Sequence, residues 1–196
     1  MKPITCVFFG ASGSGKGTQA KLLIEYLAKK DSKRKSLYVE TGQRFRDFTK
    51  SQNYTASKVK EIMAAGKFLP PFFPIWTWAG FLIENFTGEE HLIFDGVCRQ
   101  PEEGPVFHSA LQFYGRAMPV ILLLKMRNKE VEKRLLKRGR YDDTLEKIDE
   151  RLRSFEKNAM PSVEYFQKNP ECKFVTIDGD QSIEAVFEDV KKALEI

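Results

Sequence analysis

The apolar run ITCVFF (4–9) is followed at once by GASGSGKGT (10–18), and this stretch decides the fold. Glycines let the backbone curl so that successive N–H groups point at phosphate oxygens, and a helix that starts here adds the positive end of its dipole. Lys16 supplies a mobile positive charge. A glycine-rich turn that binds nothing is the alternative, but the position between a strand and a helical run favours a phosphate-binding loop. Gly17 stands where the common pattern has Ser or Thr, and the hydroxyl comes one residue later, at Thr18.

Four further apolar, β-branched runs indicate strands. They are SLYVE (36–40), HLIFD (91–95), PVILLLK (119–125) and KFVTI (173–177). Apolar periodicity predicts helices near 16–30, 55–65, 72–86, 102–116, 129–138, 143–168 and 182–195. Continuous apolar runs suit strands buried on both faces, and their separations leave room for helical crossovers. The sequence therefore predicts an α/β fold, a five-stranded parallel sheet covered by helices on both faces.

The helix expected at 143–168 has the strongest pattern. Its apolar residues Leu145, Ile148, Leu152 and Phe155 repeat at intervals of 3, 4 and 3. Asp143 is expected to cap this helix, with Glu146 three residues later. Two stretches are expected to leave the sheet: residues 41–70, and the tight turn Arg138-Gly139-Arg140.

Composition limits the classes of protein. The chain has 196 residues, a net charge of +5 and 42% hydrophobic residues, which fits one compact domain. No run approaches the ~18 apolar residues of a membrane span, and 4–9 is too short for a signal-peptide core. We therefore expect a soluble, cytoplasmic protein. Cys6, Cys98 and Cys172 lie far apart, which predicts reduced thiols rather than disulfides or a thiolate zinc site.

Positive charge is concentrated in residues 125–157, which carry 12 of the 32 Lys and Arg side chains against eight acidic ones. A solvated helix face with i,i+4 ion pairs explains such a segment. A nucleic-acid-binding surface is disfavoured, because acidic residues are interleaved and no aromatic platform accompanies the basic ones.

The loop variant GKGTQ (15–19) resembles that of nucleoside monophosphate kinases, and the rest of the chain resembles the adenylate kinase family in particular. The resemblance covers nearly the whole length, with the motifs in family order. They are Thr41-Gly42 followed by Arg46, Ala65-Gly66-Lys67-Phe68-Leu69, Asp95-Gly96-x-x-Arg99, Arg134-x-x-x-Arg138, Arg140-x-Asp142-Asp143, Arg151, and Asp178-Gly179. The resemblance implies a P-loop NTPase fold in one domain, with a monophosphate-binding excursion at 41–70 and a vestigial lid at 138–141.

The resemblance further implies reversible transfer of the ATP γ-phosphoryl group to AMP, giving two ADP. This chemistry needs positioned cations rather than a general base. The implied catalytic residues are Lys16, Arg99, Arg138, Arg140 and Arg151. The implied ATP-binding residues are Gly13, Ser14, Gly15, Lys16, Gly17, Thr18, Arg134, Arg138 and Gln181. The implied monophosphate-binding residues are Thr41, Arg46, Lys67, Phe68, Leu69, Gly96, Arg99, Glu103, Arg140 and Arg151. Magnesium is expected to accompany ATP, held through water by Asp95 and without a direct protein ligand.

Two departures from the family pattern stand out. The lid, often long and sometimes zinc-bearing, is reduced to Gly139 between two arginines, so no zinc is expected. The family's Gly-aromatic-Pro-Arg segment, with an adenine-contacting glutamine four residues on, here reads Gly96-Val97-Cys98-Arg99 with Glu103 at the glutamine position. A carboxylate pairs better with guanine than with adenine, yet Thr41 and residues 67–69 favour AMP.

Three alternatives stay open. A kinase for GMP, UMP or CMP fits the same motifs. A non-catalytic nucleotide switch is suggested by Asn128-Lys129-Glu130-Val131, but Val131 cannot accept a hydrogen bond from guanine. A basic nucleic-acid-binding module is the third alternative. We expect nucleotides as partners, without nucleic acid or membrane.

Overall fold

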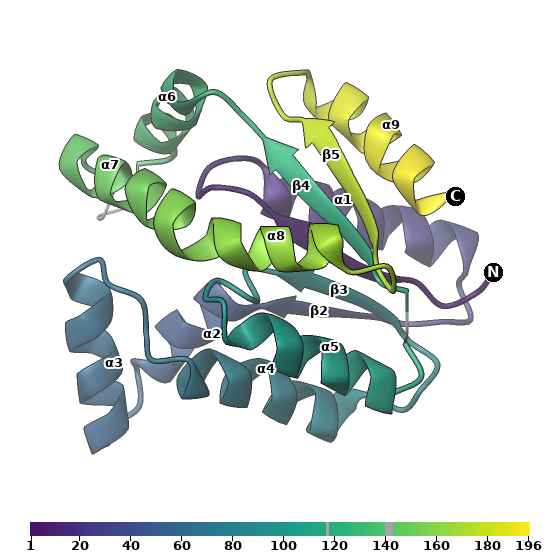
Figure 1. Ribbon diagram of the computed structural model, residues 1–196, viewed down its shortest axis with the longest axis horizontal. Coiled ribbons are helices and arrows are strands. Elements are labelled where there is room, and N and C mark those ends of the chain that lie inside the picture. Colours follow the sequence, from purple (N-terminus) through teal and green to yellow (C-terminus); the bar gives the residue numbers. More distant parts are fainter. Residues whose placement is uncertain (117, 140–142) are drawn as a thin grey trace.

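A parallel sheet forms the centre of the computed structural model, which describes residues 1–116, 118–139 and 143–196 (Figure 1). Its strands are β1 (Thr5–Phe9), β2 (Ser36–Glu40), β3 (His91–Asp95), β4 (Val120–Lys125) and β5 (Lys173–Asp178). They pair in the order β2-β3-β1-β4-β5, and every pair is parallel. Since β1 lies between β3 and β4, the order reverses at the strand that precedes the phosphate loop, where ligands of open α/β sheets bind.

Helices cover both faces of this sheet. They are α1 (Lys16–Lys30), α2 (Thr41–Phe48), α3 (Tyr54–Ala64), α4 (Phe72–Asn85), α5 (Glu103–Phe113), α6 (Asn128–Arg138), α7 (Leu145–Ser154), the π-helical turn η1 (Phe155–Ala159), α8 (Met160–Lys168) and α9 (Ile183–Leu194). Helices α1 and α9 lie on one face, and α4, α5 and α8 lie on the other (Figure 1). The predicted fold class is confirmed.

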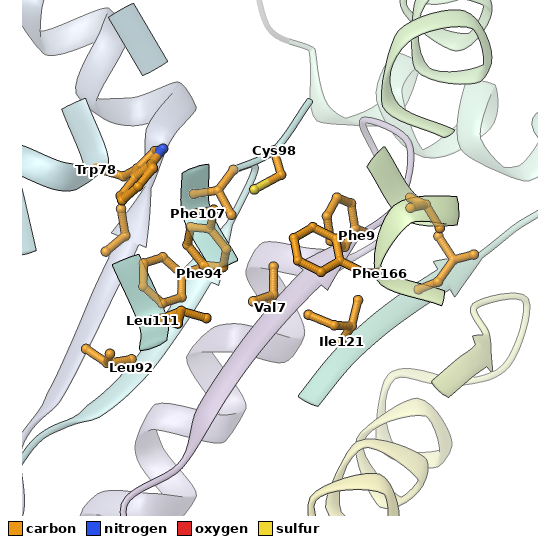
Figure 2. Close-up of a cluster of buried hydrophobic side chains, with 14 of the residues drawn as sticks. Val7, Phe9, Trp78, Leu92, Phe94, Cys98, Phe107, Leu111, Ile121 and Phe166 are labelled. Atoms are coloured by element: carbon orange, nitrogen blue, oxygen red, sulfur yellow. The ribbon is translucent and has the colours of Figure 1, made fainter. Parts of the chain in front are cut away.

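Two hydrophobic cores lie between the sheet and the helices on its two faces. Successive side chains of β1 point alternately into one core and the other. Val7 and Phe9 point into a cluster with Phe94, Phe107 and Phe166 (Figure 2). Cys6 and Phe8 point the other way, toward α1 and α9. Because both faces are apolar, the strand shows a continuous hydrophobic run instead of an alternating one.

The excursion at residues 41–70 contains one helix that sequence reasoning missed. Helix α2 begins directly after β2, in a stretch for which the sequence predicts no helix before residue 55. Phe45 and Phe48 of α2 pack on Phe73 of α4, with ring centroids 5.5 Å and 5.0 Å apart. These tertiary contacts stabilise a helix too short and polar to be predicted from its own pattern.

The predicted helix at 143–168 is interrupted by the π-helical turn η1. In this turn the N–H of Met160 bonds to the carbonyl of Phe155, five residues back. Pro161 follows, and it lacks an N–H and would crowd the carbonyl four residues before it in a regular helix. The wide turn accommodates this proline and produces an element that is common at functional sites.

The cap of α7 also differs from the expectation. Thr144 is the N-cap, and its hydroxyl accepts a hydrogen bond from the N–H of Lys147 at 3.4 Å. Asp143 is instead engaged by arginine side chains, so its assignment as the cap is wrong. At the other end of the turn, Gly139 closes α6 in the left-handed conformation, with φ +65°. Arg140 and the rest of the expected lid turn, up to residue 142, lie outside the described residues.

Within the described part of the chain, no helix combines the length and apolarity that a membrane span requires. The described ranges also contain no group of three or more His, Cys, Asp or Glu side chains placed to share a metal ion.

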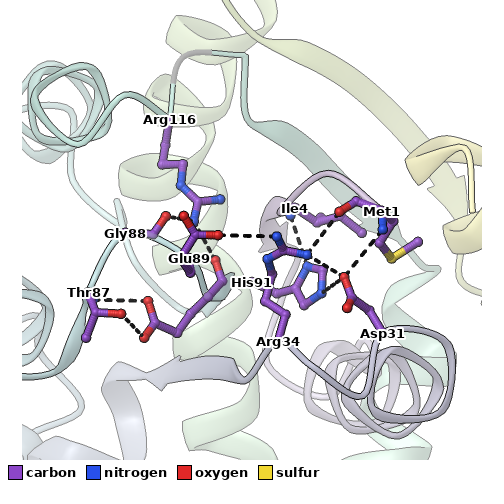
Figure 3. A network of polar contacts seen from close by, with 10 residues as sticks. Met1, Ile4, Asp31, Arg34, Thr87, Gly88, Glu89, His91 and Arg116 are labelled. Atoms are coloured by element: carbon purple, nitrogen blue, oxygen red, sulfur yellow. Dashed lines mark hydrogen bonds and ion pairs between the residues drawn. The ribbon is translucent and has the colours of Figure 1, made fainter.

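A polar network joins the amino ends of β1 and β3, on the edge opposite the phosphate loop (Figure 3). His91 is completely buried, and its Nδ1 accepts a hydrogen bond from the N–H of Ile4 at 3.0 Å. Asp31 lies 3.6 Å from His91 Nε2 and pairs with Arg34 at 2.5 Å. Arg116 closes the network by donating to the carbonyls of Gly88 and Glu90.

We expect His91 to make the fold sensitive to mild acid. Burial lowers the pKa of His91 below its ordinary value of 6.5, and the positive charges of Arg34, Arg116 and the N-terminus act in the same direction, while Asp31 opposes them. The folded state therefore favours the neutral imidazole. This stability is complete above the unfolded-state pKa and is lost as the pH falls through the lower folded-state pKa. Asp31 contributes only in stronger acid, because its pKa is lowered from 3.8.

Thermal unfolding of the parent and of His91→Asn between about pH 7.5 and pH 5 tests this expectation. The parent should lose stability over this range, and the variant should lose less, since asparagine can still accept from Ile4 but does not titrate. Equal losses in the two proteins would assign the acid sensitivity to other groups.

Candidate active site

The phosphate loop has the curled shape that its sequence predicts. Gly13 adopts φ +87°, and a Cβ added there would lie 2.8 Å from Cγ of Leu135, so this position needs glycine for both conformation and space. The Lys16 ammonium folds back and donates to the carbonyls of Gly10 and Ala11 at 2.8 Å and 2.9 Å. Among the described residues, the buried Ser14 hydroxyl finds no partner, which leaves it available to a phosphate oxygen.

The surroundings of Lys16 make its positive charge less favourable than it is in water. Burial, together with the nearby guanidinium groups of Arg99 and Arg138, lowers the pKa of Lys16 to about 8, although Asp95 opposes the shift. A lysine with a lowered pKa gains most from an anion that enters the site. The loop is therefore suited to polyphosphate.

A cavity of about 840 Å³ opens at the carboxyl edge of the sheet. Its lining includes most of the residues that the sequence analysis assigned to the site. They are Gly13, Ser14, Gly15, Lys16, Gly17, Thr18, Arg46, Lys67, Phe68, Leu69, Asp95, Gly96, Arg99, Arg134, Arg138, Arg151 and Gln181. One concave surface thus joins the phosphate loop to arginines from α2, α6, α7 and the segment after β3.

Arg138 and Arg151 are held together by one buried carboxylate. Asp143 accepts from Nε and Nη2 of Arg138 at 2.9 Å and 2.7 Å, and from Nη2 of Arg151 at 2.8 Å. The Asp143 side chain is 0% exposed, whereas the arginines are 30% and 22% exposed. The carboxylate lies behind the guanidinium groups and orients them toward the cavity that they line.

The two ends of the cavity have their own polar contacts. Arg46 pairs with Glu40 at 3.1 Å, on the side of the 41–70 excursion. At the other end, Arg134 donates to the carbonyl of Gly179 at 3.3 Å. Gln181 donates to the carbonyl of Asp178, and its contact with Asp189 steadies the same loop.

Asp95 ends β3 beside the phosphate loop, as predicted. Its Oδ2 accepts a hydrogen bond from the Tyr38 hydroxyl at 3.3 Å, and a Cβ added at Gly17 would lie 3.6 Å from the same oxygen. Burial and the neighbouring carboxylates Asp95 and Glu40 raise the pKa of Tyr38, which keeps this hydroxyl protonated and donating. A carboxylate in this position fits a hydrated cation carried by phosphates.

Two residues expected at the monophosphate base, Thr41 and Glu103, are buried and do not line the cavity. Thr41 is 1% exposed, and its hydroxyl donates to the carbonyl of Gly96 at 2.5 Å. Glu103 is also 1% exposed, and its carboxylate accepts from the N–H groups of Cys98, Arg99 and Gln100. Neither belongs to the cavity lining. In this structure both polar groups tie loops together, and their contact with the base stays a prediction. Arg140 lies outside the described residues.

Sequence reasoning missed several residues that line the cavity. Glu40 lines the cavity at the end of β2, where it pairs in register with Asp95 of β3. Its position at the end of a predicted strand, directly before the Thr41-Gly42 motif, was a signal that could have identified it. Lys147 lines the cavity one turn before Arg151. Ser154, Phe155 and Ala159 line it through the π-helical turn, for which Pro161 was the sequence signal.

Comparison with known proteins agrees with this site. The adenylate kinase family model matches residues 8–171. An adenylate kinase of Azobacteroides pseudotrichonymphae is 31% identical over 192 residues, which cover 95% of each chain. Adenylate kinase 1 of a Nostoc species is 30% identical over 188 residues, covering 96% of this chain and 97% of the relative. UMP-CMP kinase 3 of Arabidopsis thaliana is 28% identical over 192 residues, covering 97% of this chain and 88% of the relative. With a phosphate loop and converging arginines in one cavity, and similarity along nearly the whole length, the chain belongs to the adenylate kinase family of nucleoside monophosphate kinases.

Proposed function

We propose that the protein transfers the γ-phosphoryl group of ATP to AMP and so forms two molecules of ADP. An oxygen of the AMP phosphate bonds to the γ-phosphorus as the bond to the β–γ bridging oxygen breaks, and that electron pair leaves with ADP. The observation that carries the proposal is the convergence of Lys16 with Arg99, Arg138 and Arg151 on one cavity. Fixed cations stabilise the charge that spreads over the transferring group.

The two substrates would occupy opposite ends of the cavity. The loop residues 13–18 would bind the ATP phosphates, and Arg134 and Gln181 would lie near the adenine base of ATP. Arg46 and Arg99 would grip the AMP phosphate, with residues 67–69 beside its base and ribose. Arg138 and Arg151 would close over the transferring group, and Arg140 is proposed to join them from the lid turn.

Magnesium would accompany ATP and neutralise charge on its phosphates, with Asp95 holding its water shell. We propose no zinc site. The proposed organisation is a single kinase domain, with a monophosphate-binding excursion at 41–70 and a vestigial lid at 138–141. We also propose a cytoplasmic location and nucleotide partners, without nucleic acid or membrane.

The relatives differ in the monophosphate that their names give, so the choice of acceptor needs its own test. Both an adenylate kinase and a UMP-CMP kinase are similar to the chain. An assay of ADP formation with ATP against AMP, GMP, CMP and UMP separates them. We expect the highest kcat/KM for AMP. A higher value for UMP or CMP would transfer the proposal to a pyrimidine monophosphate kinase, and no turnover with any acceptor would reject phosphoryl transfer altogether.

A further inference from the structure

The segment between β3 and α5 is held by one buried carboxylate. Glu103 Oε1 accepts from the N–H groups of Arg99 and Gln100, and Oε2 accepts from the N–H of Cys98, each at 3.1 Å. Three successive donors thus converge on a side chain that is 1% exposed. A carboxylate can accept all of them, whereas a neutral amide offers only one acceptor oxygen.

The backbone of this segment depends on that carboxylate. Cys98 adopts φ +53°, a left-handed conformation that costs free energy for a residue with a side chain. Proline, which the family pattern has at this position, could neither adopt this φ nor donate an N–H. The bond from Cys98 to Glu103 therefore compensates a strained conformation in the residue directly before Arg99.

The same segment delivers Arg99 to the acceptor side of the cavity. The Arg99 guanidinium packs closely over Gly96, where an added Cβ would lie 2.9 Å from Nη2. Gln100 donates to the carbonyl of Leu69 at 2.8 Å, which ties the segment to residues 67–69. Its own carbonyl accepts from Ser162 of α8 at 2.7 Å. A loss of shape at residues 98–100 would move Arg99 and its neighbours together.

We propose that Glu103 is a positioning residue for Arg99. The ionised carboxylate of Glu103 keeps the 98–100 segment in the shape that binds the phosphate of the acceptor monophosphate. This inference rests on the proposed phosphoryl transfer. It assigns Glu103 a role in binding the acceptor phosphate, without contact to the base.

The surroundings of Glu103 make its charge responsive near neutral pH. Burial raises the pKa of Glu103 to about 7, although the three N–H groups and the Arg99 guanidinium oppose the rise. The Cys98 thiol also faces it, and burial raises the pKa of that thiol well above its usual value, so the thiol stays neutral. From α8, the Tyr165 ring packs against Gly104, and burial raises the pKa of Tyr165 as well. Below about pH 7 a protonated oxygen of Glu103 becomes a donor and cannot accept the N–H that faces it.

The test compares the parent with Glu103→Gln and with Glu102→Gln, a matched control at the exposed neighbouring position. KM for AMP, KM for ATP and kcat are measured between about pH 6 and pH 8.5. In the parent, KM for AMP should rise roughly tenfold as the pH falls through 7, which corresponds to one lost hydrogen bond to a charged group. Glu103→Gln should show a raised KM for AMP that changes little with pH, and Glu102→Gln should follow the parent. KM for ATP should follow one common pH profile in all three proteins, since Lys16, whose pKa is lowered to about 8, titrates in each of them.

The phosphate of AMP titrates near pH 6, but it does so equally for every variant, so the difference between profiles isolates Glu103. A Glu103→Gln profile with the same slope as the parent would overturn the inference. If this variant does not fold, the parent decides alone: a KM for AMP that is constant between about pH 8.5 and pH 6.8 would overturn it. Absence of ADP formation with every monophosphate would instead reject the proposed function.

Discussion

Lys16→Met should lower kcat by at least ~10², with KM for ATP changed far less. The Lys16 ammonium is attached to the phosphate loop and can leave the carbonyls of Gly10 and Ala11 to follow charge on the transferring group. An interaction of this kind is stronger in the transition state than in the ground state, so its loss appears in kcat. Methionine keeps the length and apolar stem of the side chain but removes the charge.

The same variant has a second expected property, which separates catalysis from folding. Because burial lowers the pKa of Lys16 to about 8, the side chain stays mostly charged at neutral pH, but its charge is less favourable in the folded than in the unfolded chain. Lys16→Met should therefore unfold at the same temperature as the parent or higher. Lys29→Met, at an exposed position late in the same helix, should leave both properties unchanged. An unaltered kcat in Lys16→Met would reject the assigned role of the loop lysine.

The strands and most helices were predictable because their signals are local. Each strand is a short run rich in apolar and β-branched residues, and in β1 and β3 every residue is buried, which preserves the run in the sequence. Helix α2 lacked such a signal, since only Phe45 and Phe48 mark its buried side and their partner Phe73 lies on α4. The π-helical turn likewise follows from a single proline, Pro161, that the surrounding apolar period concealed.

The candidate site also has a part that the sequence predicts and a part that it does not. The phosphate loop was predictable because its function is a backbone conformation that local glycines permit. The buried hydrogen bonds of Thr41 and Glu103 were not predictable, because they belong to loops whose shape depends on other segments. At Glu103 the decisive fact is the N–H of Cys98 at φ +53°, and a conformation of that kind cannot be deduced from residue types alone.

Asp143→Asn should lower kcat by about 10², an effect comparable with a loss of about 1 Å in the placement of reacting groups. Asp143 binds Arg138 through two parallel hydrogen bonds and also binds Arg151, and both arginines line the cavity. The asparagine amide has the same shape but turns an NH₂ group toward guanidinium donors, so the paired geometry fails. The arginines would keep their charge and lose their orientation. ATP and AMP should still bind, with KM values changed less than kcat.

Asp149→Asn provides the matched control, because Asp149 lies on α7 and makes only an exposed i,i+4 contact of 3.6 Å with Arg153 among the described residues. It should keep the turnover of the parent, as exposed ion pairs contribute little. Steady-state rates for the two variants, with circular dichroism to verify folding, decide the matter. Equal turnover in Asp143→Asn and Asp149→Asn would mean that the bound phosphates alone orient Arg138 and Arg151. A large difference would show that the Asp143 carboxylate sets the geometry of both arginines before substrate binds.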